Sequence, residues 1–205
     1  DHTSPSIWVK FPLESDPAEL AASLAGRSVS AIIWTTTPWT LPANVALCFH
    51  SGVEYAAVAT GPSPNDDVYL VAIPLVAAVA GKLGFSPKAV LARIESTRLE
   101  KARFRHPFLK RTSVGTLGNH VTMEQGTGIV HTAPAFGEDD YAAGTQNGLF
   151  LVQPVDLAGK MTGNYPWTGK FIKNADPAIM DELKSRGLLY RRETIKHTYP
   201  FCWRC

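Results

Sequence analysis

The sequence predicts an α/β fold of the α+β type, with a mixed β-barrel core and short flanking helices. Three observations lead to this class. Runs of β-branched and aromatic residues recur along the 205-residue chain, as they do in strands. Clusters of glycine, proline, asparagine and aspartate separate these runs, which is typical of turns. The few helical patterns are short, so we expect helices that flank a closed or nearly closed barrel.

The first half of the chain carries most of the predicted strands. Asp16 occupies the N-cap position of a helix that starts at Pro17, and Gly26 follows as a stop signal. A second, alanine-rich helix ends before Gly84. Pro38 and Pro42 interrupt any regular ladder between the first two strands. The predicted strands are 28–34, 45–49, 53–60 and 68–73, and the alanine-rich helix is 75–83.

The second half mixes strands with two helices. Acidic residues open the first helix, and Asp176 is the expected N-cap of the second, which stops at Gly187. A basic loop around residues 101–111 lies between two of the strands. The predicted strands are 90–95, 114–117, 129–131 and 150–154, and the predicted helices are 137–148 and 177–186.

The composition indicates a single folded domain over residues 1–205. Hydrophobic residues make up 45% of the chain and charged residues 19%, which excludes a disordered chain. No apolar run approaches the roughly 18 residues of a membrane-spanning helix, so we expect no membrane partner. Three cysteines and a start without a signal-peptide pattern favour a reducing compartment, and we expect a cytoplasmic protein.

The net charge of +2 conceals a pattern along the chain. Residues 88–111 carry a net +6 and residues 159–205 a net +5, whereas residues 112–158 carry −5 and contain no lysine or arginine. The low total excludes a protein that grips nucleic acid over its whole surface. The alternative is that the stretch without lysine or arginine reflects chance and a buried core, because buried strands exclude charge.

The two ends of the sequence suggest an excised piece of a longer protein. The first residue is Asp1, and the last residues include Cys202 and Cys205 in a C-x-x-C pattern. Two thiolates at this spacing are half of a tetrahedral zinc site, so no complete metal site is expected in this chain. We interpret the tail as a structural joint that a zinc ion could complete in the longer protein.

The first candidate cluster is the threonine-rich segment 34–44. It contains Thr35, Thr36, Thr37, Thr40 and Asn44, at a point where two prolines bend the backbone. Hydroxyl and amide groups in such a loop can hold a substrate and orient water. The alternative is a strand end whose threonines cap their own backbone.

The second candidate cluster is segment 126–141. A strand leads to His131, a Pro/Gly corner follows, and Asp140 lies where acidic residues open a helix. His131 could act as a base, a ligand or a pocket wall, and Asp140 could bind a cation or an amino group. The alternatives are a hydrogen-bonded structural histidine and a carboxylate that stabilises the helix dipole. Signatures of serine hydrolases, metalloproteases and zinc deaminases are absent.

These clusters together resemble the editing domain of the isoleucyl-tRNA synthetase family. Residues 35–44 resemble its threonine-rich peptide, and residues 126–141 resemble its second editing motif. Residues 106–108 and 118–122 match further stretches, and the tail 197–205 resembles the return of the inserted domain to the synthetase core. Valyl and leucyl enzymes typically carry Arg-Pro after the first threonines, where this chain has Thr37, Pro38 and Trp39.

The resemblance implies a β-barrel with flanking helices that hydrolyses mischarged valyl-tRNA(Ile), and it allows valyl-adenylate as a second substrate. Its partners would be the 3′-aminoacylated end of isoleucine tRNA, the valine moiety and the synthetic core of the same enzyme. It implies no cofactor for editing, although zinc could bind in the full-length enzyme.

The resemblance also implies a role for each candidate residue. Asp140 would hold the α-ammonium group, and His131 with the threonines, Thr35 included, would wall the side-chain pocket. Trp39 would stack on the terminal adenine or serve as a core residue. The contacts to the ester, the ribose or the water would come from Thr36, Thr37, Thr40 and Asn44. The competing function is a non-catalytic module that binds the tRNA 3′ end, with phosphate contacts from the basic segments.

Overall fold

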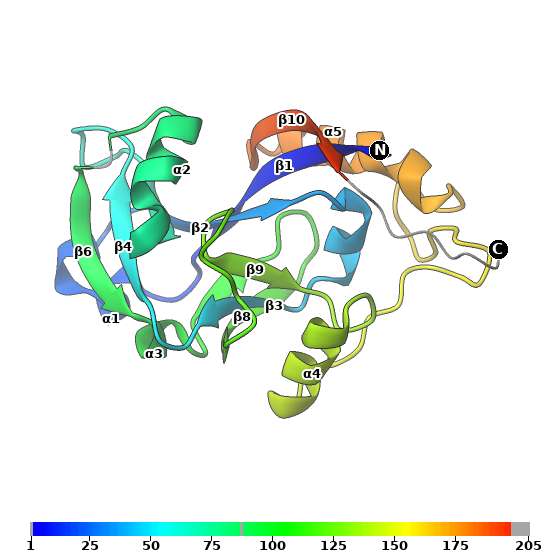
Figure 1. Cartoon of the computed structure of the whole chain (residues 1–205), viewed down its shortest axis with the longest axis horizontal. Helices are drawn as coiled ribbons and strands as arrows, with labels where there is room; N and C mark the ends of the chain where they lie inside the picture. The colour runs from blue at the N-terminus through cyan, green and yellow to red at the C-terminus, as the bar shows by residue number, and fades with distance from the viewer. Residues whose placement is uncertain (1, 87, 198–205) are drawn as a thin grey trace.

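In a computed structural model that describes residues 2–86 and 88–197, the chain forms two mixed β-sheets with short helices around them (Figure 1). The larger sheet has the strand order β10-β1-β2-β5-β4-β6, and the smaller has the order β7-β8-β3-β9. The mixed α/β class is therefore confirmed. The described strands form two sheets rather than one closed barrel, which corrects the expected closure.

The larger sheet contains the longest strands. All neighbouring pairs in it are antiparallel except β2 with β5. Its central strand β2 is buried on both faces for most of its length, which explains its β-branched composition. The members of this sheet are β1 His2–Pro12, β2 Val29–Thr35, β4 Glu54–Ala59, β5 Val68–Ala72, β6 Val90–Glu95 and β10 Leu189–His197.

The smaller sheet positions the candidate residues. Strand β3 lies at its interior, parallel to β8 and antiparallel to β9. The short strand β7 lies in the predicted basic loop and pairs with β8. The members are β3 Ala46–His50, β7 Arg103–Arg105, β8 Thr112–Gly118 and β9 Ile129–Thr132.

One contact region joins the two sheets. The Thr127 hydroxyl donates to the carbonyl of Ile32, and the Thr127 carbonyl accepts a hydrogen bond from the Ala72 backbone. Gly128 follows with φ of 73°, and a Cβ atom there would lie 2.4 Å from the Cβ of Ala72. Only glycine satisfies both conditions, so this residue fixes where β9 starts.

Helical segments lie between and around the strands. The Asp16 side chain accepts a hydrogen bond from the Ala18 backbone and caps α1, and Gly84 ends α2 with a left-handed backbone, as predicted. The described segments are α1 Pro17–Leu20, η1 Ala22–Leu24, η2 Pro38–Ala43, η3 Ile73–Leu75, α2 Val76–Leu83, α3 Ser96–Leu99, α4 Glu138–Gln146 and α5 Ile172–Ser185. None of these helices has the length and apolar character that crossing a bilayer requires.

Two local predictions are wrong. Residues 150–154 form no strand, and Phe150 and Leu151 are 59% and 55% exposed, so these apolar side chains have no strand partner to bury them. Helix α5 starts at Ile172 rather than Pro177, and Asp176 lies inside it. Its buried face has helical spacing that continues across the proline, and this burial outweighs the lost backbone donor.

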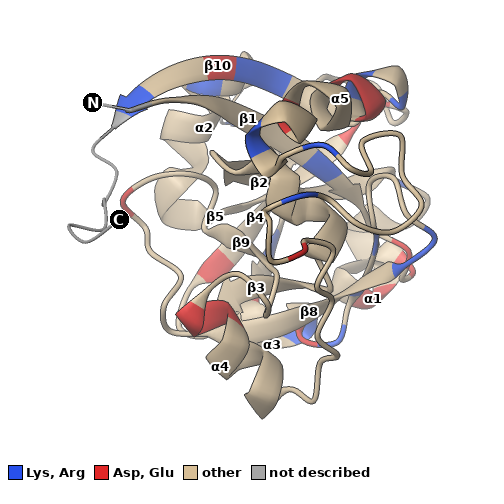
Figure 2. Cartoon of the chain, turned by 90° about the vertical axis from the view of Figure 1, so that its right-hand side faces the viewer, with Lys and Arg blue, Asp and Glu red and all other residues tan. Residues whose placement is uncertain are grey.

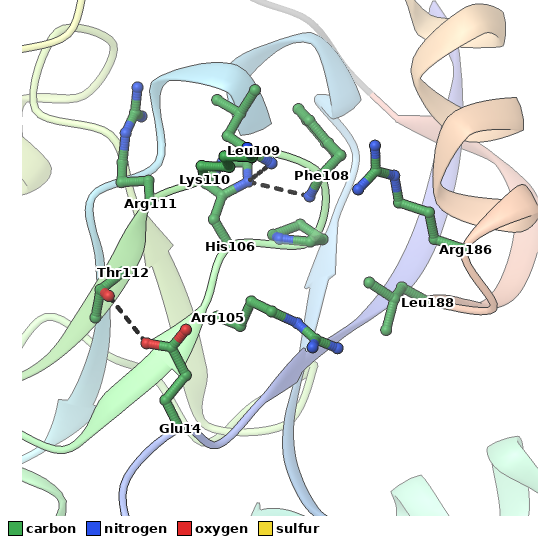
Figure 3. Close-up of a pocket in the computed structure, with 11 residues that line it drawn as sticks. Glu14, Arg105, His106, Phe108, Leu109, Lys110, Arg111, Thr112, Arg186 and Leu188 are labelled. Carbon is green, nitrogen blue, oxygen red and sulfur yellow. Dashed lines mark hydrogen bonds between the residues drawn. The ribbon is translucent and has the colours of Figure 1, made fainter.

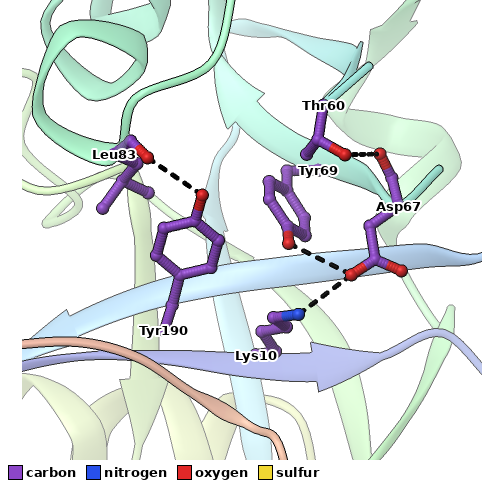
Figure 4. A network of polar contacts seen from close by, with 6 residues as sticks. All are labelled: Lys10, Thr60, Asp67, Tyr69, Leu83 and Tyr190. Atoms are coloured by element: carbon purple, nitrogen blue, oxygen red, sulfur yellow. Dashed lines mark hydrogen bonds and ion pairs between the residues drawn. The ribbon is translucent and has the colours of Figure 1, made fainter. Parts of the chain in front are cut away.

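A polar network ties the edge of the larger sheet to α2 (Figure 4). The Lys10 ammonium lies 2.9 Å from Asp67 Oδ2, which also accepts from the Tyr69 hydroxyl at 3.1 Å. The Tyr69 and Tyr190 rings meet edge to face, with Lys10 within 5.6 Å of each centroid. The Tyr190 hydroxyl donates to the Leu83 carbonyl. The network therefore links β1, β5, β10 and α2.

Candidate active site

The threonine-rich segment connects β2 to η2. Thr35 is buried, and its hydroxyl accepts a hydrogen bond from the Thr37 backbone at 3.1 Å and lies 3.2 Å from the Thr37 hydroxyl. These two threonines thus stabilise the bend between them. Thr36 is partly exposed, and its hydroxyl makes no hydrogen bond to the described part of the chain.

The register of the smaller sheet brings His131 to this segment. Strand β9 pairs Leu47 with His131 and Ala46 with Thr132, and the Thr132 carbonyl accepts from the Val45 backbone. Asn44 immediately precedes Val45, so its side chain reaches the same point of the sheet. Residues 87 positions apart in the sequence therefore meet through one strand pair.

Hydrogen bonds fix the orientation of the His131 ring. The Thr40 hydroxyl donates to the Thr37 carbonyl at 2.8 Å, so it accepts from Nε2–H of His131 at 3.0 Å. Nδ1 then faces the amide nitrogen of Asn44 at 3.4 Å. This assignment gives the neutral Nε2–H tautomer. Burial lowers the pKa of His131 and keeps it neutral, although the Asp140 carboxylate acts in the opposite direction.

Asn44 is fully buried behind this ring. Its amide nitrogen donates to the Ala46 carbonyl at 2.9 Å, and its oxygen accepts from the Ser113 hydroxyl. With its side chain engaged by β3 and β8, Asn44 positions His131 rather than facing the surface.

Asp140 lies in the first turn of α4. Its Oδ2 atom accepts a hydrogen bond from the Ala133 backbone at 3.0 Å, two residues after His131. Within the described residues, its other oxygen has no hydrogen-bond partner. Figure 2 shows this acidic turn of α4, with Lys and Arg gathered on other segments. A half-exposed carboxylate without a neighbouring cation is suited to an ammonium group.

Trp39 lies on η2 with its ring packed edge to face against Phe136, at 5.2 Å between centroids. Its Nε1 atom is buried, and among the described residues it has no hydrogen-bond partner. The Trp39 ring thus already contacts one aromatic side chain of the protein, and its stacking on adenine remains a prediction.

Three side chains that sequence analysis did not assign to the site hold the backbone of this segment. Asp176 of α5 accepts from the Trp39 backbone at 2.9 Å, and His106 Nε2 donates to the Leu41 carbonyl at 2.9 Å. Arg111 donates to the carbonyls of Pro42 and Asn44. The two prolines were the available signal, because they leave carbonyl groups that no regular ladder can satisfy.

His106 is a permanent neutral donor in this arrangement. Its Nδ1 atom accepts from the Phe108 and Leu109 backbones, which places the proton on Nε2. Burial lowers its pKa to about 3, so the ring does not ionise near neutral pH.

The structure does not describe the predicted metal half-site. Cys202 and Cys205 are outside the described residues, and Cys48 is a buried free thiol. Across residues 2–86 and 88–197, no group of three or more His, Cys, Asp or Glu side chains could hold a metal ion.

The structure brings Thr37, Thr40, His131 and Asp140 to the junction of η2, β9 and α4, with Asn44 behind them. It offers a carboxylate, a neutral imidazole and hydroxyl groups. It does not offer a paired acid and base that would act as a strong general base. Such a site is suited to hold an amino group and to position water.

Comparisons with known proteins identify the relatives of the chain. It is 45% identical over its whole length to the isoleucine–tRNA ligase of Syntrophotalea carbinolica and 41% identical to that of Geobacter sulfurreducens. It spans 22% of the length of each of these relatives. No protein-family model matches.

Solved structures show the same fold at low identity. The crystal structure of GlLeuRS-CP1 aligns with a TM-score of 0.71 and 16% identity, over 95% of this chain and all of that one. The editing domain of the P. knowlesi cytosolic leucyl-tRNA synthetase aligns with a TM-score of 0.68 and 12% identity, over 89% of this chain and 94% of that one. The chain is thus homologous over its full length to one segment of isoleucine–tRNA ligases, and it has the fold of synthetase editing domains.

Proposed function

We propose that this chain is the editing domain of an isoleucine–tRNA ligase and hydrolyses the ester bond of valyl-tRNA(Ile). The observation that carries the proposal is the meeting of Thr37, Thr40, His131 and Asp140 at one junction. Valine lacks one methylene of isoleucine, and a methylene is worth only about 1–3 kcal/mol in an apolar pocket; this amino-acid pair is a standard example of that limit. A second, hydrolytic step therefore has a physical purpose.

Each group has a part in the proposed reaction. The unpartnered oxygen of Asp140 accepts hydrogen bonds from the α-ammonium group of valine. The neutral His131 ring and the threonines limit the volume open to the side chain, so that isoleucine is excluded. Thr36, Thr37 and Thr40 contact the ester or the water, and Trp39 lies beside the terminal nucleotide.

The chemistry needs water and no cofactor. The water oxygen adds to the ester carbonyl carbon, and the bond from that carbon to the ribose oxygen breaks. The ribose hydroxyl regains a proton that the water loses, and valine is released. Because no strong base lies at the junction, positioning of the water accounts for most of the rate.

The test replaces Asp140 with Asn, which can keep the hydrogen bond from Ala133 while it loses the charge. We expect the first-order rate of valyl-tRNA(Ile) hydrolysis at excess protein to fall about 10- to 100-fold, as when a charge-assisted hydrogen bond is lost. Asp139→Asn, an exposed neighbour in the same turn, is the control and should hydrolyse at the unaltered rate.

Two results would contradict the proposal. Unchanged hydrolysis by Asp140→Asn would remove this carboxylate from the reaction. Binding of valyl-tRNA by the unaltered chain without hydrolysis above the protein-free rate would favour a non-catalytic module for the tRNA 3′ end.

A further inference from the structure

A cleft of about 710 Å³, which we call the basic cleft, adjoins η2 and is lined by residues that the proposed reaction does not use. Arg105, Lys110, Arg111 and Arg186 contribute four cations, against the single carboxylate of Glu14. Figure 3 shows that they come from separate segments: the end of β7, the loop after it and the residue that follows α5.

The charges of the basic cleft are only partly balanced. Glu14 accepts a hydrogen bond from the Thr112 hydroxyl, and Arg186 pairs with Glu182 at 2.6 Å. Within residues 2–86 and 88–197, Arg105 and Lys110 form no ion pair. Both therefore keep donors for an incoming anion.

Like charges around one cavity repel each other, and an anion relieves this repulsion. Burial also lowers the pKa of the Arg111 guanidinium, and an anion beside it would favour its charged form. Arg111 stays in place because its donors bind the carbonyls of Pro42 and Asn44. The wall of the cleft is thus fixed before any ligand arrives, which reduces the ordering cost of binding.

We propose that the basic cleft binds successive phosphate groups of an RNA strand. The guanidinium groups of Arg105, Arg111 and Arg186 point to different parts of the cleft rather than to one centre (Figure 3). This spacing suits a repeated anion better than a single phosphate ion, and a planar guanidinium matches phosphate oxygens in pairs. The choice of RNA rests on the tRNA substrate proposed above, whereas the anion chemistry rests on the cleft itself.

The experiment measures fluorescence anisotropy of a 5′-labelled, uncharged isoleucine tRNA transcript against salt concentration. The variant combines Arg105→Gln, Lys110→Gln and Arg186→Gln and leaves Arg111 intact, because Arg111 supports η2. We expect the Kd to rise at least about tenfold, and the slope of log K against log salt to become shallower by about 2. The control combines Arg93→Gln, Lys160→Gln and Lys170→Gln, which remove the same charge outside the cleft.

Unchanged tRNA affinity and salt slope in the cleft variant, with an unchanged thermal midpoint, would overturn the proposal. Equal losses in the control variant would do the same, because they would indicate general charge. A second arm titrates inorganic phosphate into the chain and follows the arginine side-chain NMR signals. Binding of phosphate with no effect of the cleft variant on tRNA would make this a small-anion site and refute the RNA assignment.

The outcome is separable from that of the proposed hydrolysis. Uncharged tRNA has no ester, so the binding measurement does not need a working acyl site. Asp140→Asn should bind this tRNA as the unaltered chain does. A cleft that binds tRNA in a chain that hydrolyses nothing would sustain the inference and reject the proposed reaction.

Discussion

At the scale of single residues, His131 is the side chain whose state the structure defines most fully. Both ring nitrogens have partners, and the Thr40 hydroxyl and the Asn44 amide determine which nitrogen carries the proton. A neutral ring held in this way is a rigid wall, because rotation would break both contacts. It is also a poor proton acceptor, because Nε2 already carries hydrogen and the lone pair of Nδ1 faces the Asn44 amide N–H.

The sieve role of His131 predicts a change in specificity. In His131→Ala, Thr40 still donates to Thr37 and Asn44 still bonds to Ala46 and Ser113, so we expect the fold to remain. The larger space should admit isoleucine, and the ratio of valyl-tRNA to isoleucyl-tRNA hydrolysis rates should fall about tenfold or more.

His50→Ala is the control for this prediction, because His50 is a partly buried histidine at the end of β3. It should leave the ratio of the two rates unaltered. If His131→Ala also kept that ratio, His131 would be a structural residue only.

Sequence reasoning identified the residues of this junction but not which of them are accessible. Asn44 has the same polar character as its neighbours in the motif, yet it is fully buried. Burial depends on β8 and β9, which lie far along the chain, and a local motif carries no information about them. Cys202 and Cys205 lie outside the described residues, so their zinc role stays a prediction.

At the scale of elements, η2 is a short segment whose backbone is held by other elements. Its two prolines were predicted to interrupt the ladder, and the segment is indeed a 3₁₀ turn between β2 and β3. The side chains that satisfy its backbone come from α5 and from the stretch between β7 and β8. Those partners could not be predicted, because Asp176 has the appearance of a helix cap in the sequence.

Asp176 makes the junction of η2 with α5 sensitive to pH. Burial raises its pKa to about 6, although Lys173 and the Trp39 backbone act against this shift. Its pKa in the unfolded chain is about 3.9. Between about pH 4 and pH 6, Asp176 is therefore protonated in the folded chain and ionised in the unfolded chain. The free energy of unfolding should therefore fall as pH rises from about 4 to about 6, by on the order of 2 kcal/mol.

Asp176→Asn removes this titration and can keep an oxygen acceptor for Trp39. Urea unfolding between pH 4 and 7 should show a flatter dependence in the variant, with a gain in stability over the unaltered chain above pH 6. Identical pH profiles for the two proteins would mean that Asp176 does not carry the effect.

At the scale of the whole molecule, the longest ladder joins the first and last described strands. Sequence analysis assigned no strand to either: β1 contains Pro5, and charged residues are frequent in β10. These strands form because they pair with each other, and local composition does not show which distant segments pair. The same limit explains why a closed barrel was expected. The sequence predicted many short strands, but their division into two sheets depends on which strands pair.

The network around Lys10 should contribute to global stability. Burial would raise the pKa of Asp67, but the hydrogen bond and charge of Lys10 outweigh it and lower the pKa. This contribution is present above pH 4 and is lost as pH falls through the lowered pKa of the folded state. Lys10→Met should cost about 1 kcal/mol at pH 7, a value reduced for the exposure of Asp67, and less near pH 3.

Thermal unfolding of Lys10→Met at both pH values measures this difference. Arg93→Met is the control, because its ion pair with Glu54 is long and exposed, at 3.8 Å. A cost for Lys10→Met that did not shrink in acid would show that packing of its methylene groups, rather than the charge, is responsible.

The pairing of β1 with β10 also has a mechanical consequence. Residues 2 and 197 are direct partners, so the described chain begins and finishes at one corner of a two-stranded ribbon. The strands of such ribbons are more strongly twisted than those of wide sheets. Anything attached at that corner would be joined to the rest of the molecule through this ribbon. A change in the twist of the ribbon would move the threonine-rich segment and the basic cleft together, because hydrogen bonds from His106 and Arg111 join the two.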